Sequence, residues 1–180
     1  QGYAVILNNM SLLEKTGNHY SELSSYQSAI SKSIKLFNKT QIDGLVYVAM
    51  HDRDVMELIP KLSIPIVLVY CYDTSKNNYY VTYDNVDVIV DVAECLMKRG
   101  NEKIGVIKGA EDSLPSQKRL KSFITQLKKE GKELKEEYIF PGAWEFDDGV
   151  KAYERYKQLE EKPTAIFAMN DLMAVGFMDA

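Results

Sequence analysis

The sequence has few residues of the kinds that form covalent cross-links or bind metal ions. Only two of its 180 residues are cysteines, and only two are histidines. Cys71 and Cys95 belong to no CxxC motif, and neither His19 nor His51 lies at a metal-ligand spacing from them. The sequence therefore excludes a disulfide scaffold and predicts no metal site. We expect both thiols to be buried and unreactive, which fits a reducing cytoplasm.

Long apolar runs and an excess of positive charge are also missing. No apolar run approaches the roughly 20 residues of a membrane-spanning helix, and no basic segment followed by an apolar stretch marks a signal peptide. The net charge is −4, whereas a nucleic-acid surface needs clustered Lys and Arg. We expect neither a membrane nor nucleic acid to contact this segment. Because apolar patterns run up to both ends, at 2–7 and 178–180, we expect a part of a longer protein.

The common motifs of catalysis and nucleotide binding are absent as well. No GxGxxG follows an expected strand, and neither a GxxxxGK[ST] loop nor a GxSxG turn occurs. Neither histidine follows a serine or cysteine in a catalytic arrangement. The sequence therefore predicts a protein that is not an enzyme and has no cofactor. An enzyme built on a doubly wound sheet is kept as an alternative, behind the two binding functions given below.

What the sequence does contain is short apolar runs that alternate with segments of helical period. Apolar residues make up 46% of the chain, which is enough to form a core. This alternation predicts an α/β fold with doubly wound parallel sheets, in which ligands bind beyond the carboxyl ends of the strands. Strands are expected over 3–8, 43–49, 64–70, 79–83, 103–108, 137–140 and 164–169. Helices are expected over 20–38, 54–62, 85–99, 116–130, 147–160 and from 171 onward.

Two polar pairs lie where an expected strand leads into an expected helix. They are Asp84-Asn85 and Asn170-Asp171. Asp and Asn are favoured residues at the N-terminal cap of a helix, so capping explains one member of each pair. The other member is able to face a ligand, because Asp accepts hydrogen bonds and Asn both donates and accepts them.

Two further residues carry chemistry that suits a ligand. Arg119 is expected in the first turn of a helix, either as a solvated surface residue or as a planar fork that binds two ligand oxygens. Trp144, the only tryptophan, follows an expected strand. It either packs against the protein or stacks on a sugar ring or a flat base.

A set of motifs resembles, in order and spacing, those of lactose-repressor/galactose-repressor (LacI/GalR) type transcription regulators. The segment 163–176, Pro-Thr-Ala-Ile-Phe-Ala-Met-Asn-Asp-Leu-Met-Ala-Val-Gly, is similar to the family's PTAIFAxNDxMAxG signature. Earlier segments are similar to the family's VDGII, IPVV, V..DN, HLIxxGHrrIaf, G…sxxRlxGf and W/F…G motifs. In the same order, these segments are 42–45, 64–67, 81–85, 96–106, Gly109 with Arg119-Leu120, and Trp144 with Gly149. The resemblance covers nearly the whole chain.

This resemblance implies a periplasmic-binding-protein-like (type I) core of two doubly wound parallel-sheet lobes, incomplete at both ends. The N-terminal lobe would span 1–100, without its first strand and helix, and the truncated C-terminal lobe would span 101–180. By the same resemblance, a small-molecule effector such as a sugar or sugar phosphate lies in the cleft between the lobes. The residues that match effector-contacting positions of the family are Asp84, Arg119, Trp144 and Asn170.

The resemblance also implies the partners of the complete protein. It implies a cytoplasmic regulator that forms a homodimer and binds operator DNA through a helix-turn-helix domain absent from this chain. The helix that begins at Asp171, with Phe177 and Met178, is the candidate dimer surface, and a simple core helix is the alternative. The alternative function is a periplasmic or lipoprotein sugar-binding component of an importer, which shares the fold.

Overall fold

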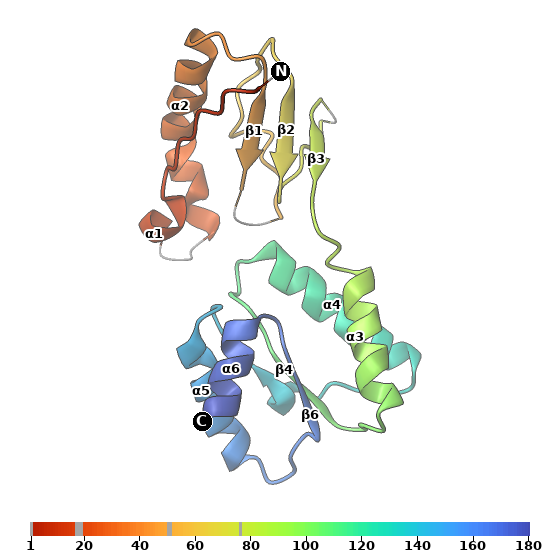
Figure 1. Cartoon of the computed structure of the whole chain (residues 1–180). Helices are drawn as coiled ribbons and strands as arrows, with labels where there is room; N and C mark the ends of the chain where they lie inside the picture. Colours follow the sequence, from red (N-terminus) through yellow and green to blue (C-terminus); the bar gives the residue numbers. More distant parts are fainter. Residues whose placement is uncertain (1, 17–19, 50–51, 76) are drawn as a thin grey trace. The chain divides into compact units, whose positions relative to one another are not determined.

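A computed structural model describes residues 2–16, 20–49, 52–75 and 77–180, so that His19 and His51 lie outside the described residues. The contacts within the chain divide it into two compact units, residues 1–81 and residues 82–180. Each unit contains a three-stranded parallel sheet with helices packed on it (Figure 1). The predicted α/β class, with parallel strands in two separate sheets, is confirmed.

The first unit places one long helix along its sheet. The strand order is β1-β2-β3, and Leu45 pairs with Ile66 in the parallel register. Ile30 and Ile34 of α2, four residues apart on one face of the helix, meet the sheet in a core that includes Leu68. The elements along the chain are α1 (Leu12–Thr16), the 3-10 helix η1 (Tyr20–Tyr26), α2 (Gln27–Lys39), β1 (Leu45–Val48), β2 (Ile66–Val69) and β3 (Tyr79–Val81).

The strand predicted over residues 3–8 is absent. The segment joins neither sheet, and Tyr3 and Leu7 are 99% and 87% exposed, although the side-chain amide of Asn8 donates a hydrogen bond to the hydroxyl of Ser33. A strand requires a neighbour to satisfy its backbone hydrogen bonds, and an apolar run alone does not supply one. The apolar run therefore did not predict whether the segment pairs with a strand.

The helix predicted over residues 54–62 is also absent. The backbone N–H groups of Leu58 and Ile59 both donate to the carbonyl of Val55, which closes a single turn. Pro60 follows directly and has no N–H with which to continue a helical ladder. This segment is therefore a turn, and its apolar residues Val55 and Leu58 are buried in the core of the first unit.

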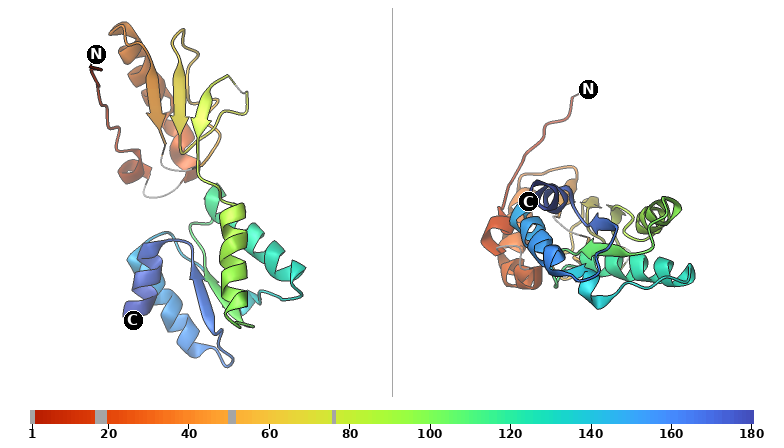
Figure 2. Two further views of the ribbon diagram at one scale, coloured as in Figure 1. Left: turned by 45° about the vertical axis from the view of Figure 1, so that its right-hand side comes forward. Right: turned by 90° about the horizontal axis from the view of Figure 1, so that it is seen from below.

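The second unit is a three-layer arrangement. Its strand order is β5-β4-β6, all parallel, with α3 and α4 on one side of the sheet and α5 and α6 on the other (Figures 1 and 2). The elements along the chain are α3 (Asp87–Lys98), β4 (Ile104–Ile107), α4 (Leu114–Lys129), the 3-10 helix η2 (Glu136–Tyr138), β5 (Ile139–Phe140), α5 (Phe146–Gln158), β6 (Ala165–Ala168) and α6 (Asp171–Asp179). Every residue of β4 is buried, as expected of a central strand covered on both faces.

Helices α5 and α6 pack with their backbones in close contact. A Cβ atom placed on Gly149 would lie 2.1 Å from the carbonyl oxygen of Met173, and one placed on Gly176 would lie 2.0 Å from that of Phe146. Neither position has room for a side chain. The two glycines therefore set how closely these helices approach.

The boundary between the compact units differs from the lobe boundary expected near residue 100. Helix α3 accounts for the difference, because it packs against α4 and so belongs with the second unit. Ile89 and Ala93 of α3 are buried in the same core as Phe123 of α4. The division into lobes 1–100 and 101–180 stays a prediction about the complete protein.

The two cysteines lie in different environments. Cys71 is buried, as expected, whereas Cys95 on α3 is exposed, so the expectation of two buried thiols is wrong for Cys95. Among the described helices, none is long and apolar enough to cross a membrane.

Candidate functional site

Three of the four candidate residues, Arg119, Trp144 and Asn170, lie around the carboxyl ends of β4 and β6 in the second unit. Arg119 is held by contacts from three other segments of the chain. Its Nε donates to Oδ1 of Asn85 at 2.8 Å, and its Nη1 donates to the carbonyl oxygen of Met169 at 2.6 Å. Arg119 is therefore partly buried and oriented, rather than a solvated surface residue.

Two aromatic rings flank the Arg119 guanidinium. Its Cζ lies 5.6 Å from the ring centroid of Tyr83 and 5.8 Å from that of Trp144, within the range of cation–π attraction. Among the described residues, none accepts a hydrogen bond from Nη2 of Arg119. The side chain is thus fixed in place while retaining donors that a ligand could use.

Arg119 lies one turn later in its helix than the sequence predicted. Helix α4 begins at Leu114, because Ser113 caps it and Pro115 occupies its first turn, where a missing N–H costs nothing. The Ser113 hydroxyl accepts from the backbone N–H of Ser116 at 3.4 Å. Arg119 is therefore in the second turn, away from the strongest part of the positive end of the helix dipole.

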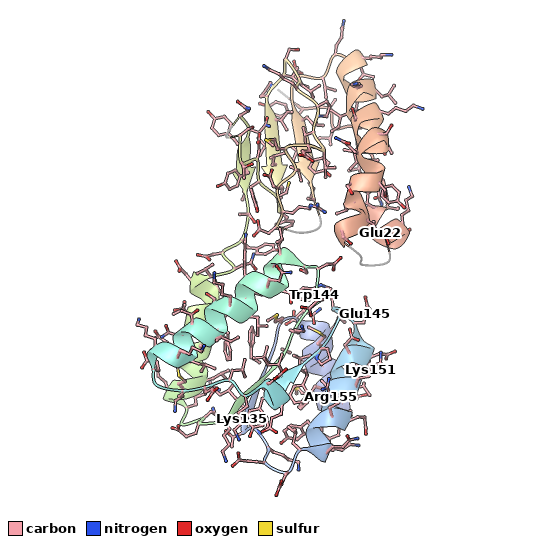
Figure 3. All side chains as sticks on the ribbon, turned by 180° about the vertical axis from the view of Figure 1, so that it is seen from behind. Glu22, Lys135, Trp144, Glu145, Lys151 and Arg155 are labelled. Atoms are coloured by element: carbon pink, nitrogen blue, oxygen red, sulfur yellow. The ribbon has the colours of Figure 1, made fainter. Side chains whose placement is uncertain are left out.

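Trp144 has an unusual backbone and a closely packed ring. Its φ is +79°, a left-handed conformation that bulky side chains rarely adopt and that costs about 1–3 kcal/mol. The indole lies directly on the backbone of Gly109, since a Cβ atom on that glycine would be 2.1 Å from Cζ2 of the ring. Trp144 stands just before the first turn of α5, beside Glu145 (Figure 3). The strained turn and the glycine together set the position of the indole.

Asn170 performs two tasks with one side chain. Its Oδ1 accepts from the backbone N–H of Met173 at 2.9 Å and so caps α6. Its Nδ2 donates to the carbonyl oxygen of Trp144 at 2.7 Å. The capping predicted for one member of the Asn170-Asp171 pair is confirmed, and the same residue also contacts the turn that carries the indole.

Asp84 caps α3. Its Oδ1 accepts from the backbone N–H groups of Val86 and Asp87 at 2.7 and 3.0 Å. These N–H groups stabilise the charged carboxylate, so they hold the pKa of Asp84 below its ordinary value. The carboxylate is exposed and its other oxygen, Oδ2, lies outside these two bonds.

The structure brings Arg119, Trp144 and Asn170 together, and it adds partners that the sequence did not identify. The contact from the Asp84-Asn85 pair to Arg119 is made by Asn85, which is 4% exposed, and not by Asp84. Tyr83 is the other addition from this segment. The sequence signal for Asn85 was its position next to Asp84 at the end of an expected strand. Capping accounts for only one of these two adjacent polar residues.

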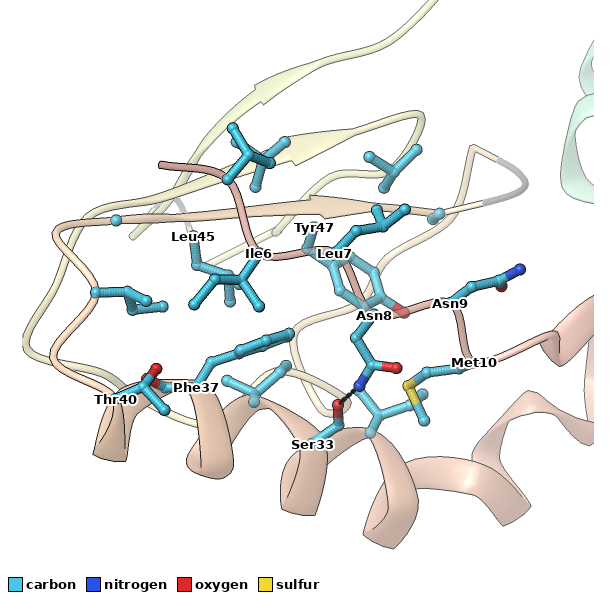
Figure 4. Close-up of a pocket in the computed structure, with 18 of the residues that line it drawn as sticks. Ile6, Leu7, Asn8, Asn9, Met10, Ser33, Phe37, Thr40, Leu45 and Tyr47 are labelled. Atoms are coloured by element: carbon cyan, nitrogen blue, oxygen red, sulfur yellow. Dashed lines mark hydrogen bonds between the residues drawn. The ribbon is translucent and has the colours of Figure 1, made fainter. Parts of the chain in front are cut away.

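Two apolar cavities in the described part of the chain lie elsewhere. The larger, of about 700 Å³, is in the first unit, between residues 3–12, helix α2 and strand β1 (Figure 4). The other, of about 550 Å³, lies among β6, α5 and α6. None of the four predicted ligand residues lines either cavity, so the case for a ligand site rests on the polar cluster around Arg119. Within the described part of the chain, no group of three or more His, Cys, Asp or Glu could hold a metal ion.

Comparison with known proteins identifies the fold and the family. Residues 21–180 match the profile of the family described as periplasmic binding proteins and sugar binding domain of LacI family. Among solved structures, the transcriptional repressor ascG of Escherichia coli is similar with a TM-score of 0.71 at 23% identity, covering 89% of this chain and 67% of that one. A regulatory protein of LacI family from Chloroflexus aggregans has the same TM-score at 22% identity, covering 100% of this chain and 69% of that one. At these identities the two structures support the fold alone.

Two curated relatives match most or all of the chain. Catabolite control protein A of Priestia megaterium is 28% identical over 159 residues, which is 86% of this chain and 48% of that protein. The HTH-type transcriptional repressor PurR of Mannheimia succiniciproducens is 27% identical over 183 aligned residues, which is 100% of this chain and 51% of that protein. The chain thus spans about half the length of these relatives, which are regulators rather than enzymes. It belongs to the family of periplasmic binding proteins and LacI-type sugar-binding domains.

Proposed function

We propose that this chain is the effector-binding core of a bacterial transcription regulator, and that its effector is a sugar or sugar phosphate. The observation that carries the proposal is the Arg119 guanidinium, oriented by Asn85 and Met169 and placed beside the indole of Trp144. A planar cation binds two vicinal oxygens at once, and an indole packs on the C–H face of a sugar ring. Few other small molecules combine an apolar face with a rim of hydroxyls.

Each proposed ligand contact has a distinct role. Arg119 donates from Nη2 to ligand oxygens, and the exposed carboxylate of Asp84 accepts from ligand hydroxyls. Trp144 supplies the apolar platform, and Asn170 uses its second amide hydrogen and second lone pair, beyond the two bonds that it already makes. Because these groups are only partly buried, we expect micromolar affinity, about −8 kcal/mol.

Regulation would come from a difference in the affinity of the effector for two arrangements of the protein. A ligand shifts an equilibrium between two arrangements of a protein only by its difference in affinity for them. We propose that this shift reaches operator DNA through a DNA-binding domain outside this chain, in the cytoplasm, where the operator is. The repressor relatives favour this function over the sugar-binding component of an importer.

We further propose a homodimer that uses α6. Three apolar side chains, Leu172, Val175 and Met178, recur every three residues on this helix and are 54%, 53% and 83% exposed. Phe177, also expected at that surface, packs edge-on against the rings of Tyr153 and Tyr156 and so serves the core. Replacing Met178 with Glu should shift the sedimentation coefficient towards that of a monomer. An unchanged dimer would contradict the role of this helix.

The proposed function is tested by a thermal-shift screen of the complete regulator against sugars, sugar phosphates and purines, because a ligand that binds the folded state raises its apparent stability. Isothermal titration then compares the protein with its Arg119→Ala variant. We expect binding to be lost while the circular dichroism spectrum is preserved. Unchanged binding by Arg119→Ala would refute this site, and stabilisation by purines alone would refute the sugar as effector.

A further inference from the structure

The turn that carries Trp144 needs support from outside itself. A residue at φ +79° returns to a more favourable conformation unless its neighbours hold it. The N–H groups on either side, of Ala143 and Glu145, donate to Oδ2 of Asp148 at 2.7 and 3.1 Å. The carbonyl of Trp144 itself is held by Nδ2 of Asn170. The support from Asn170 is the one that comes from a different strand–helix junction.

We propose that Asn170 is a positioning residue for Trp144, one that holds the strained turn so that the indole stands beside Arg119 before any ligand arrives. The proposal rests on the proposed function in that Trp144 is taken to be the ligand platform. It assigns to Asn170 a role in the ligand-free protein, in addition to any contact with the ligand.

The chemistry of the side chain supports this assignment. Capping of α6 uses only Oδ1, and Asp or Ser would serve about equally well as caps. Only an amide offers an acceptor and a donor on two separate atoms at the end of one short side chain. The Nδ2 contact with Trp144 is therefore the part of the arrangement that capping does not explain.

The test uses two substitutions that keep the cap and remove the donor. Asn170→Asp retains an acceptor for the N–H of Met173, and its negative charge suits the N-terminus of α6. It also sets a carboxylate oxygen against the carbonyl of Trp144. Asn170→Ser retains a good cap but is too short to reach that carbonyl, and it adds no charge. Agreement between the two variants separates the lost donor from the added charge.

The readout is the fluorescence of Trp144, the only tryptophan of the 180-residue chain, in the absence of ligand. Acrylamide quenching and the emission maximum report how firmly the indole is held. Loss of one hydrogen bond should change the ratio of the held turn to the released turn by about fivefold. We expect both variants to show stronger quenching and red-shifted emission, with unchanged circular dichroism.

Asn101→Asp is the matched control. Asn101 also donates from Nδ2 to a backbone carbonyl, that of Leu96 at 2.9 Å, and its Oδ1 accepts from the hydroxyl of Thr164 at 2.9 Å. The chemical change is the same, but none of these partners touches Trp144, so the fluorescence should stay that of the parent. A response equal to that of Asn170→Asp would overturn the proposal, because the effect would then be general.

The outcomes separate this proposal from the proposed function. If the folded Asn170→Asp and Asn170→Ser variants quench like the parent, Asn170 does not position Trp144, even if the melting temperature falls through a weaker cap. If quenching rises in both, the positioning role stands, whether or not any sugar binds. A failed sugar screen would refute the effector class and leave the fluorescence result intact.

Discussion

Nε of Arg119 donates a hydrogen bond to Oδ1 of Asn85, a buried side chain 34 residues earlier in the chain. This bond ties the segment in front of α3 to the second turn of α4. The acceptor is the neutral amide oxygen of a residue that is 4% exposed, so a loss of this oxygen leaves the guanidinium without a replacement from bulk water on that side.

Asn85→Ala should therefore destabilise the second unit. We expect the free energy of unfolding to fall by about 1–3 kcal/mol, the usual cost of leaving a partly buried donor without its acceptor. Denaturation by urea, followed by circular dichroism, measures the change. Lys121→Ala, at an exposed position of the same helix α4, is the control and should stay within about 0.5 kcal/mol of the parent. Equal effects of the two substitutions would argue against the Asn85–Arg119 contact.

Gly109→Ala tests the close packing of the Trp144 indole on the backbone of Gly109. The added methyl would lie 2.1 Å from Cζ2 of Trp144, so the ring must move. Overpacking of this kind costs about 1–3 kcal/mol of stability. We expect a lower melting temperature together with a red shift of tryptophan emission. Gly2→Ala, at a position where an added Cβ meets nothing within 4 Å, should change neither.

The two cysteines should differ in reactivity. Burial raises the pKa of the Cys71 thiol to about 12, so at pH 8 it is protonated and inaccessible. Cys95 is exposed on α3. We expect a chromogenic disulfide reagent to titrate one thiol in the native protein and two in urea. Cys95→Ser should abolish the native signal, whereas Cys71→Ser should preserve it. Rapid native modification of Cys71 would contradict its burial.

Acid should weaken the ion-pair cluster at the end of the second unit. Glu161 accepts hydrogen bonds from the ammonium groups of Lys103 and Lys135, which lower its pKa from 4.5 to about 2. A carboxylate with a lowered pKa stabilises the fold above its unfolded pKa and ceases to do so as the pH falls through its folded pKa. The contribution of Glu161 is therefore complete above pH 4.5 and is lost towards pH 2.

Glu161→Gln should accordingly flatten the pH dependence of the melting temperature between pH 4.5 and 2, while the parent loses stability over that range. Glu154→Gln removes another exposed carboxylate, which pairs with Lys157 on the same helix α5, and provides the control. If both variants track the parent below pH 4.5, the cluster does not contribute to folding.

Much of the second unit could be predicted from the sequence, because its signals are local. The helix expected over 85–99 is present as α3, and Gly100, with φ at +85°, follows its end. The helix expected over 116–130 is present as α4, and its apolar residues Phe123 and Leu127, four positions apart, are buried. Caps at Asp84 and Asn170 follow from the preferences of single residues at helix ends. Each of these signals concerns a few neighbouring positions.

What the sequence did not predict depends on distant segments. The strand expected over 3–8 is absent because pairing requires a partner, and an apolar run does not show whether one is present. The same holds for the site. The identity of the residue that touches Arg119 depends on how residues 83–85 meet α4, and neighbouring Asp84 and Asn85 cannot be ranked by type alone.

The close backbone contact between α5 and α6 at Gly149 and Gly176 has a consequence for how the two helices can move. At these two glycines the backbones meet with no side chain between them, and Phe177 of α6 packs on the rings of Tyr153 and Tyr156 of α5, so we expect the two helices to shift together. Trp144 lies two residues before α5, and Asn170 directly precedes α6. We therefore expect a displacement of either residue to move both helices together. This motion would also displace Met178, which lies near the C-terminal end of α6.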